Sequence, residues 1–201
     1  ISIQQELEAE TGPNKLPKFR TQYGYTAYSE GWGLYAEALS REMGFLKDPY
    51  SYYGQLSGEI WRAIRLVVDT GIHSKGWTEE QAVKYFTDNS SIAEGAIASE
   101  VRRYITSAGQ ATAYKIGMIK LQQMRDKART ELGDKFSYPA FHDQILGGGA
   151  LPLPVLEAVE RLRRKQATSP SDFYYNRGGP LHHRSRLIFA EHLGVDWRGL
   201  F

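Results

Sequence analysis

The densest group of residues that could do chemistry lies in one stretch of the sequence, residues 30–73. In the helix expected over residues 59–73, several polar side chains fall on nearly one line, because successive helical residues are about 100° apart. That line consists of Arg62, Asp69 and His73, with Arg65 beside it. Polar residues on the inner side of a helix predict the lining of an active-site cavity. The alternative is a structural salt-bridge stripe against a neighbouring helix.

Two kinds of chemistry fit this stripe. Asp69 and His73 are four residues apart, so the carboxylate can reach an imidazole N–H and the pair can shuttle a proton. Arg62 and Arg65 can each hold a substrate carboxylate through two parallel hydrogen bonds.

A pair of carboxylates marks the preceding helix, expected over residues 26–43. Glu30 and Glu37 are seven residues apart and share a face, with Leu34 between them. The small residues Gly31 and Gly33 allow another helix to approach closely. A carboxylate on such a face can be a zinc ligand, although a solvated face is the alternative.

Tyrosine, arginine and histidine side chains follow in the second half of the sequence. Tyr104 and Tyr114 are candidates for stabilising an oxyanion, and Arg103 for clamping a carboxylate. Core tyrosines and a surface arginine are the alternative. His142, between an aromatic and an acidic residue, is a candidate for substrate binding or a structural histidine. The histidines at 182–183 and 192 have no supporting pattern.

Composition limits the possible functions. The 201 residues, with a net charge of +2 and 41% hydrophobic residues, suffice for one domain with a sizeable core. No basic, aromatic-interleaved patch predicts nucleic-acid binding, and no apolar run reaches the roughly 18 residues of a transmembrane helix. The absence of cysteine excludes disulfides and thiolate chemistry, but does not choose between cytoplasm and periplasm.

The periodicity predicts an all-α fold. Besides the two helices above, helices are expected over residues 94–104, 111–132, 137–145 and 153–165, with another starting after Thr78 as a capping box with Gln81. Residues 11–17 read as a loop, and no alternating β pattern exceeds four residues. We therefore expect one helical part over residues 1–165, followed by a basic tail over 166–201. From residue 161 onward, eight basic and three acidic residues give a net charge of +5.

The start of the sequence predicts a fragment of a larger protein. Residue 1 is Ile1 rather than methionine, and residues 1–7 already read like the interior of an amphipathic helix without a cap. We expect a missing N-terminal part to contribute to any site.

Several motifs in order resemble the bacterial domain of unknown function 885 family, over about residues 1–165. They are Tyr28-Ser-Glu-Gly-Trp-Gly-Leu-Tyr-Ala-Glu37, Arg62-Ala-Ile-Arg-Leu-Val-Val-Asp-Thr-Gly-Ile-His73, Arg103-Tyr104, Gly109-Gln110, Tyr114-Lys-Ile-Gly117 and Phe141-His-Asp143. The family resembles helical zinc peptidases related to thimet oligopeptidase, which implies the C-terminal part of a gluzincin-like helical fold. Its members are often lipoproteins or secreted proteins, which implies a periplasmic or secreted location, with a lipid anchor on the missing N-terminal part.

The resemblance implies a zinc site to which Glu30 supplies the third ligand. The two histidine ligands and the general-base glutamate would lie upstream of Ile1, and no H-E-x-x-H motif occurs in this chain. We therefore expect a peptide-hydrolysing enzyme when the protein is complete, and a fragment that alone is inactive and binds no zinc. Ala108 departs from the family pattern, which has proline before Gly109, and the tail after Gln166 matches nothing in it. The alternative is a non-catalytic helical binding or structural protein.

Overall fold

The computed structural model describes Ala9 and residues 23–166. Within these residues the chain forms helices and no β-strand, which confirms the all-α prediction. The predicted loop at residues 11–17 and the basic tail, except for Gln166, lie outside the described residues. The chain divides into two compact units, one of residues 25–123 and one whose described part is mainly residues 124–166. Helix α7, Ala113–Leu132, contributes to both.

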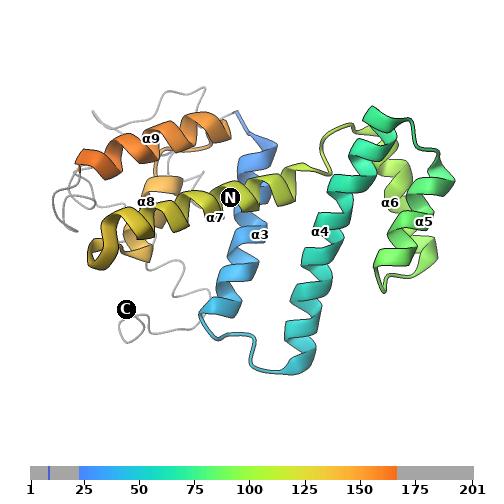
Figure 1. The fold of residues 1–201 in the computed structure, drawn as a ribbon, viewed down its shortest axis with the longest axis horizontal. Coiled ribbons are helices and arrows are strands. Elements are labelled where there is room, and N and C mark those ends of the chain that lie inside the picture. The colour runs from blue at the N-terminus through green and yellow to red at the C-terminus, as the bar shows by residue number, and fades with distance from the viewer. Residues whose placement is uncertain (1–8, 10–22, 167–201) are drawn as a thin grey trace. The chain divides into compact units, whose positions relative to one another are not determined.

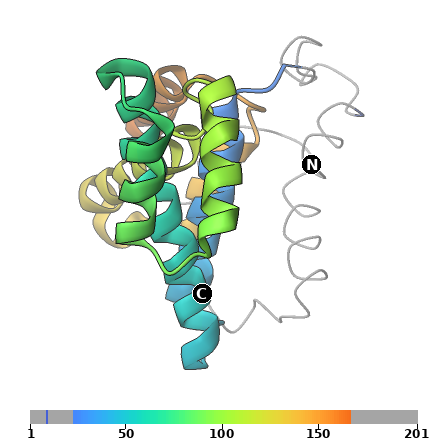
Figure 2. The same cartoon turned by 90° about the vertical axis from the view of Figure 1, so that its right-hand side faces the viewer.

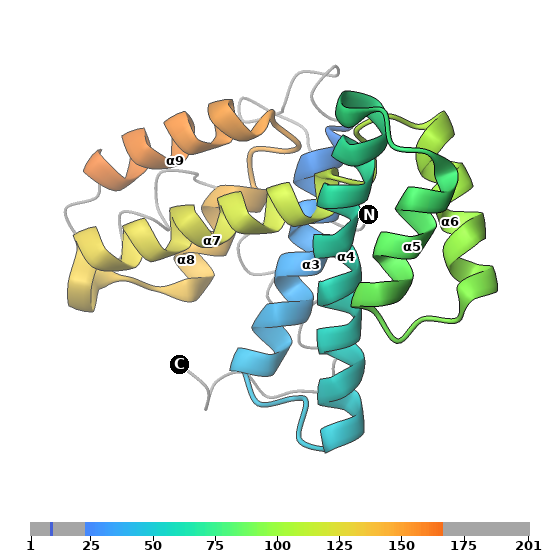
Figure 3. The ribbon, with the colours of Figure 1, turned by 45° about the vertical axis from the view of Figure 1, so that its right-hand side comes forward.

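The unit of residues 25–123 is organised around its longest helix. Helix α4 (Pro49–Lys75) packs against α3 (Thr26–Glu42) and against a pair formed by α5 (Glu79–Asn89) and α6 (Glu94–Thr106). Figures 1 and 3 show α4 between α3 and the α5–α6 pair. In Figure 2 the two green helices of this pair lie side by side, and the first turns of α4, in teal, extend beyond them.

The ends of these helices follow from local sequence. Gly44, shortly after α3, has a positive φ of 76°. Its N–H donates to Arg41 O and the N–H of Phe45 donates to Ser40 O, which is a Schellman-type helix ending. Thr78 and Gln81 form the predicted capping box at the start of α5, because each side chain bonds the other's backbone N–H.

Helix α4 begins ten residues before the predicted start at residue 59. Asp48 caps it by accepting a hydrogen bond from Ser51 N at 2.9 Å, and Pro49 occupies the first turn. The residues that follow the cap, 50–58, are rich in tyrosine, serine and glycine and show no apolar periodicity that would have predicted a helix. The exposed side chain of Tyr50, 87% accessible, shows that this end of α4 is not covered by its own unit.

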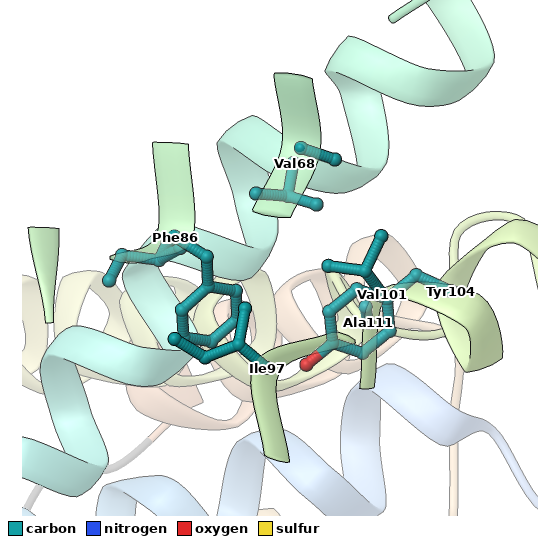
Figure 4. Close-up of a cluster of buried hydrophobic side chains, with 8 residues drawn as sticks. Val68, Phe86, Ile97, Val101, Tyr104 and Ala111 are labelled. Carbon is teal, nitrogen blue, oxygen red and sulfur yellow. The ribbon is translucent and has the colours of Figure 1, made fainter. Parts of the chain in front are cut away.

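The core of this unit lies between α4, α5 and α6. Figure 4 shows its main side chains, which are Val68, Phe86, Ile97, Val101, Tyr104 and Ala111. The cluster is apolar except for the hydroxyl of Tyr104, a buried polar group that needs hydrogen-bond partners. The core therefore fixes the position of one of the predicted site residues.

A second contact fixes α3 against the first half of α7. A Cβ atom on Gly117 would overlap the backbone carbonyl of Ala27, and one on Gly31 would overlap the backbone of Gly117. The predicted close approach at Gly31 therefore exists, whereas a Cβ on Gly33 would meet nothing. Glu30 and Tyr114 both lie within one turn of this glycine contact.

The second unit consists, in its described part, of the end of α7, a short 3-10 helix η1 (Gly133–Lys135), α8 (Tyr138–Leu146) and α9 (Leu153–Gln166). The buried ion pair between Arg164 Nη1 and Glu160 Oε2, at 2.7 Å, joins neighbouring turns of α9.

In the part of the chain that is described, no helix combines the length and apolar character needed to cross a membrane.

Candidate functional site

The centre of the candidate site is a hydrogen bond between Glu30 on α3 and Tyr114 on α7. The Tyr114 hydroxyl donates to Glu30 Oε1 at 2.8 Å, across a separation of 84 residues. Both residues are half-buried. The glycine contact between Gly31 and Gly117 brings the two helices close enough for this bond. The two residues singled out as metal ligand and oxyanion donor are therefore in direct contact.

Two arginines of α4 lie over the ring of Tyr114. The guanidinium carbons of Arg65 and Arg62 are 4.9 Å and 5.9 Å from the ring centroid, within the range of cation–π attraction. Both also lie within 5.7 Å of the Trp61 ring centroid. The site therefore combines one carboxylate, one phenol and two cations.

The two arginines differ in how their N–H groups are used. Arg65 is buried, and it donates from Nε to Tyr104 OH at 2.8 Å and from Nη2 to Glu100 Oε2 at 2.9 Å. Arg62 donates from Nη1 to the carbonyl of Gly58 at 3.0 Å. Its buried Nε has no hydrogen-bond partner among the residues that the structure describes. Arg62 is thus the arginine of this pair whose hydrogen-bonding capacity is not filled by its described neighbours.

The hydroxyl of Tyr104 is the centre of a dense polar network. It accepts hydrogen bonds from Arg65 Nε at 2.8 Å and Trp61 Nε1 at 3.1 Å, and it donates to Glu100 Oε2 at 2.8 Å. Burial raises the pKa of Tyr104, even though the donated bond from Trp61 and the charge of Arg65 act in the opposite direction. The phenol therefore remains protonated at neutral pH.

Glu100 is the anion of this network. Arg103 donates to both of its oxygens and also to Gln110 Oε1, at distances between 2.9 Å and 3.3 Å. Burial alone would raise the pKa of Glu100, but hydrogen bonds from Arg103 and Tyr104 and the charges of Arg103 and Arg65 outweigh it and hold the pKa at about 2. Arg65 and Arg103 thus share one carboxylate.

Asp69 and His73 do not form the predicted pair. Both oxygens of Asp69, which is 3% exposed, accept from the N–H of Gly109 at 3.1 Å. His73 Nε2 lies 3.0 Å from the carbonyl oxygen of Tyr104, and the residue is exposed, so the prediction that it lies on the inner side of its helix is wrong. The reason is the turn between α6 and α7, where Gly109 adopts a φ of +80° and directs its N–H at Asp69.

The last of the predicted site residues, His142, lies on α8 in the other unit. Its ring is 5.9 Å from that of Tyr138 and 5.7 Å from that of Phe141. Burial, together with the nearby charge of Arg125, lowers the pKa of His142 to about 4. The imidazole is therefore neutral at physiological pH.

Four important residues were not singled out from the sequence. Glu100 carries a local signal, because it lies three and four residues before Arg103 and Tyr104 on one helix. Trp61 and the ion pair of Lys115 Nζ with Glu59 Oε1, at 2.6 Å, depend on contacts between distant parts of the chain. No periodicity could have identified them.

Among the residues that the structure describes, no group of three or more histidine, aspartate or glutamate side chains could hold a metal ion. Glu30 is thus a single candidate ligand in this part of the chain. Its carboxylate still has acceptor capacity beside the bond from Tyr114, because an ionised carboxylate offers about four lone-pair positions. The geometry at Glu30 is therefore compatible with one metal ligand, supported by a hydrogen bond from a neighbouring residue.

Comparison with known proteins gives a match to a sequence family and matches to solved structures. The sequence model of the family described as "Bacterial protein of unknown function (DUF885)" matches residues 4–159. A solved structure, the crystal structure of "the putative lipoprotein from Colwellia psychrerythraea", is 39% identical in sequence and similar in fold, with a TM-score of 0.77. The similarity covers 82% of this chain and 27% of that protein, so this chain spans only about a quarter of its relative's length. No curated protein matches the chain.

Proposed function

The chain belongs to the DUF885 family of bacterial proteins of unknown function, and we propose that its complete form is a zinc-dependent peptidase. The observation that carries the proposal is the bond from Tyr114 to Glu30 at 2.8 Å, beneath the guanidinium groups of Arg62 and Arg65. A carboxylate held by a phenol, with cations beside it, fits a site that binds a metal and stabilises negative charge.

Glu30 is proposed as one zinc ligand. Ligating carboxylates are commonly held by hydrogen bonds from neighbouring groups, and Tyr114 supplies such a bond. Zinc, when bound, would polarise the carbonyl of the peptide bond. The remaining ligands are proposed to come from the part of the complete protein that this chain does not include, since the chain spans 27% of its structural relative.

Tyr114 is the better candidate for the oxyanion donor. Its proton goes to Glu30 alone, and rotation of the hydroxyl could redirect it to a negatively charged oxygen. The proton of Tyr104 goes to Glu100, and two further donors already use its oxygen. Tyr104 would then support the site by fixing Arg65 rather than by contacting substrate.

Arg62 is the best candidate for holding a carboxylate of the substrate. Its Nε has no partner among the described residues, whereas Arg65 and Arg103 are committed to Glu100. Asp69 and His73 are proposed to position the turn that leads into α7, through Gly109 N and Tyr104 O. His142, in the other unit, is proposed separately as a substrate-binding residue, because burial keeps its imidazole neutral at physiological pH.

A non-catalytic helical binding or structural protein is the second candidate. It is favoured by the network of Arg65, Glu100, Arg103 and Tyr104, whose members satisfy one another as they would in a structural salt-bridge cluster. In that case the polar stripe of α4 would stabilise the fold without contacting a substrate.

The substitution Glu30→Gln in the complete protein, compared with the unsubstituted protein, distinguishes the two candidates. It keeps the shape of the side chain and removes its charge. Changes of groups around a metal commonly cost about 10–100-fold in metal affinity or activity, and loss of a direct ligand should exceed that. The control is Glu37→Gln, on an exposed residue of the same helix. Zinc content after dialysis and hydrolysis of a peptide mixture are measured in all three proteins. Full zinc and full activity in Glu30→Gln would show that Glu30 is not a zinc ligand, whereas no zinc and no hydrolysis in the unsubstituted protein would favour the structural protein.

A location outside the cytoplasm, with a lipid anchor on a part of the protein before Ile1, belongs to the same proposal. It is supported by the description of the structural relative as a lipoprotein. Membrane fractionation of the native host, before and after removal of the lipidated segment, tests it directly.

A further inference from the structure

A second candidate site lies in the same unit, in a groove of about 760 Å³ along the first half of α4. One wall is a stripe of α4 side chains spaced three or four residues apart, namely Tyr53, Leu56, Ile60 and Ala63. Another wall is residues 88–91, at the end of α5 and in the loop that follows. This volume falls in the range of sites that bind small molecules or short peptide segments.

Contacts between the elements that line the groove hold its shape. The hydroxyls of Tyr53 and Ser91 are 2.8 Å apart, and this hydrogen bond links α4 to the loop after α5. The ion pair of Lys115 and Glu59 links α7 to α4. Leu56 and Ile60 nevertheless remain 40% and 47% exposed, so apolar surface in the groove is open to an occupant. A groove that is formed in advance lowers the entropic cost of binding.

Arg41 is a cation of the groove that forms no direct ion pair with a described residue. Lys115 pairs with Glu59 and Lys84 with Asp88, at 2.6 Å and 2.8 Å. Against the effect of burial, hydrogen bonds from Lys115 and Gln55 and the charges of Lys115 and Arg41 lower the pKa of Glu59, so Arg41 acts on this carboxylate from beyond ion-pair distance. Arg41, from α3, also lines the groove, with its guanidinium carbon 5.8 Å from the ring centroid of Tyr52. No ion pair to Arg41 is formed within residues 23–166. A guanidinium in this situation is suited to a bidentate carboxylate.

We infer that the groove binds the C-terminal end of a peptide. The terminal carboxylate pairs with Arg41, and the last side chain, an apolar one, packs against Leu56 and Ile60. A chain terminus carries both groups on one residue, whereas an internal acidic residue has no apolar side chain of its own to place there. The groove adjoins the proposed centre, because Lys115 follows Tyr114 on α7 and Glu59 lies one turn before Arg62 on α4. That this peptide is a substrate rests on the proposed function, but its binding does not.

The test is a binding measurement on the complete protein carrying Glu30→Gln, so that hydrolysis does not interfere. The probe is an N-terminally labelled peptide of alanines ending in leucine, followed by fluorescence anisotropy. We expect the free acid to bind about tenfold more tightly than the C-terminal amide, because the amide lacks the charge that Arg41 pairs with. Arg41→Gln should remove this difference, and Arg102→Gln, on an exposed arginine outside the groove, should keep it.

A second variant tests the apolar wall. Ile60→Ser should weaken binding of the leucine-ending peptide several-fold and leave a glycine-ending peptide unchanged, because only leucine reaches the wall. Equal affinity for acid and amide in the Glu30→Gln protein would overturn the inference. So would variants of Arg41 and Ile60 that lower thermal stability while peptide affinity stays the same, because the groove would then be filled by another part of the protein.

The outcomes also separate this inference from the proposed peptidase activity. If the wild-type protein hydrolyses no peptide but the acid preference follows Arg41, the peptidase proposal fails and the peptide groove stands. If the protein hydrolyses peptides without any preference for the free acid, the groove inference fails and the peptidase proposal stands.

Discussion

The surroundings of Tyr104 and Tyr114 contrast two uses of the same chemistry on neighbouring helices. The hydroxyl of Tyr104 accepts two hydrogen bonds and donates one, inside a network with Trp61, Arg65 and Glu100. The hydroxyl of Tyr114 donates to Glu30, and this is the one hydrogen bond that it makes within the described part of the chain. Arg65 touches both tyrosines and belongs mainly to the first network.

The difference separates side chains that stabilise the fold from side chains that can bind a ligand. A polar group whose bonding capacity is filled by its neighbours stabilises a unique arrangement and has nothing to offer a ligand. A carboxylate, a phenol and a guanidinium with unused capacity can still bind one. By this criterion the site is centred on Glu30, Tyr114 and Arg62, and the Tyr104 network is the frame that holds α4 and α6 beside it.

The largest expected effect that separates the two regions is a loss of stability in Tyr104→Phe. Removal of the hydroxyl leaves the buried Arg65 Nε, Trp61 Nε1 and one oxygen of Glu100 with fewer partners, and each such loss costs roughly 1–3 kcal/mol. We expect the free energy of unfolding to fall by about 3 kcal/mol. Chemical denaturation followed by tryptophan fluorescence measures it, and Tyr85→Phe, a half-buried tyrosine of α5, is the control. A Tyr104→Phe protein as stable as the control would show that the network does not stabilise the fold.

Tyr114→Phe in the complete protein should show the opposite pattern, with a small loss of stability and a large loss of activity. The variant loses one hydrogen bond of a half-buried group, so stability should fall by only about 1 kcal/mol and zinc should be retained. The rate constant kcat for peptide hydrolysis should fall about 10²-fold, because one oxyanion donor is gone. An unchanged kcat would move the chemistry away from Tyr114 and weaken the contrast between the two tyrosines.

The third prediction concerns the pH dependence of the Tyr104 network. The pKa of Glu100 is about 2, below its ordinary value of 4.5, so its ionised form is favoured by folding. This stabilisation is fully present above pH 4.5 and is lost as the pH falls towards about 2. We expect Glu100→Gln to cost on the order of 2 kcal/mol at pH 6 and progressively less at lower pH. Denaturation at several pH values measures the difference, with the exposed Glu94→Gln as a control; a cost that does not change with pH would contradict the assignment.

Much of the fold could be predicted from the sequence because its signals are local. The capping box of Thr78 and Gln81, the glycine ending at Gly44 and the apolar periodicity of α9 each depend on residues within one or two turns. The motifs that predicted the family depend on residue identity alone, and the family match over residues 4–159 confirms them. The first ten residues of α4 escaped because their tyrosines, serines and glycines have no apolar face to detect.

The sequence predicted candidate site residues but not how they pair with one another. Helical spacing placed Asp69 and His73 within reach of each other, yet a turn 40 residues later in the sequence supplied Gly109 N–H to Asp69 instead. The bond of Tyr114 to Glu30 depends on two glycines that let α3 and α7 approach, a contact across more than 80 residues. Periodicity in a sequence predicts one helix at a time and does not show which other helix packs against it.

The smallest predicted effect compares two arginines that differ in their remaining capacity. Arg62→Lys keeps the charge and loses the planar fork, so substrates with an acidic side chain should bind less well, with KM raised about tenfold. Its effect on stability should be small, because Arg62 donates one hydrogen bond, to Gly58 O. Arg65→Lys should lower stability and change KM little. Lys cannot reproduce the donation from Nε to Tyr104 and from Nη2 to Glu100 together. Steady-state kinetics measures KM for both variants, and chemical denaturation measures their free energies of unfolding. If Arg62→Lys lowers stability as much as Arg65→Lys and leaves KM unchanged, Arg62 belongs to the frame, and the proposed site loses its substrate-binding cation.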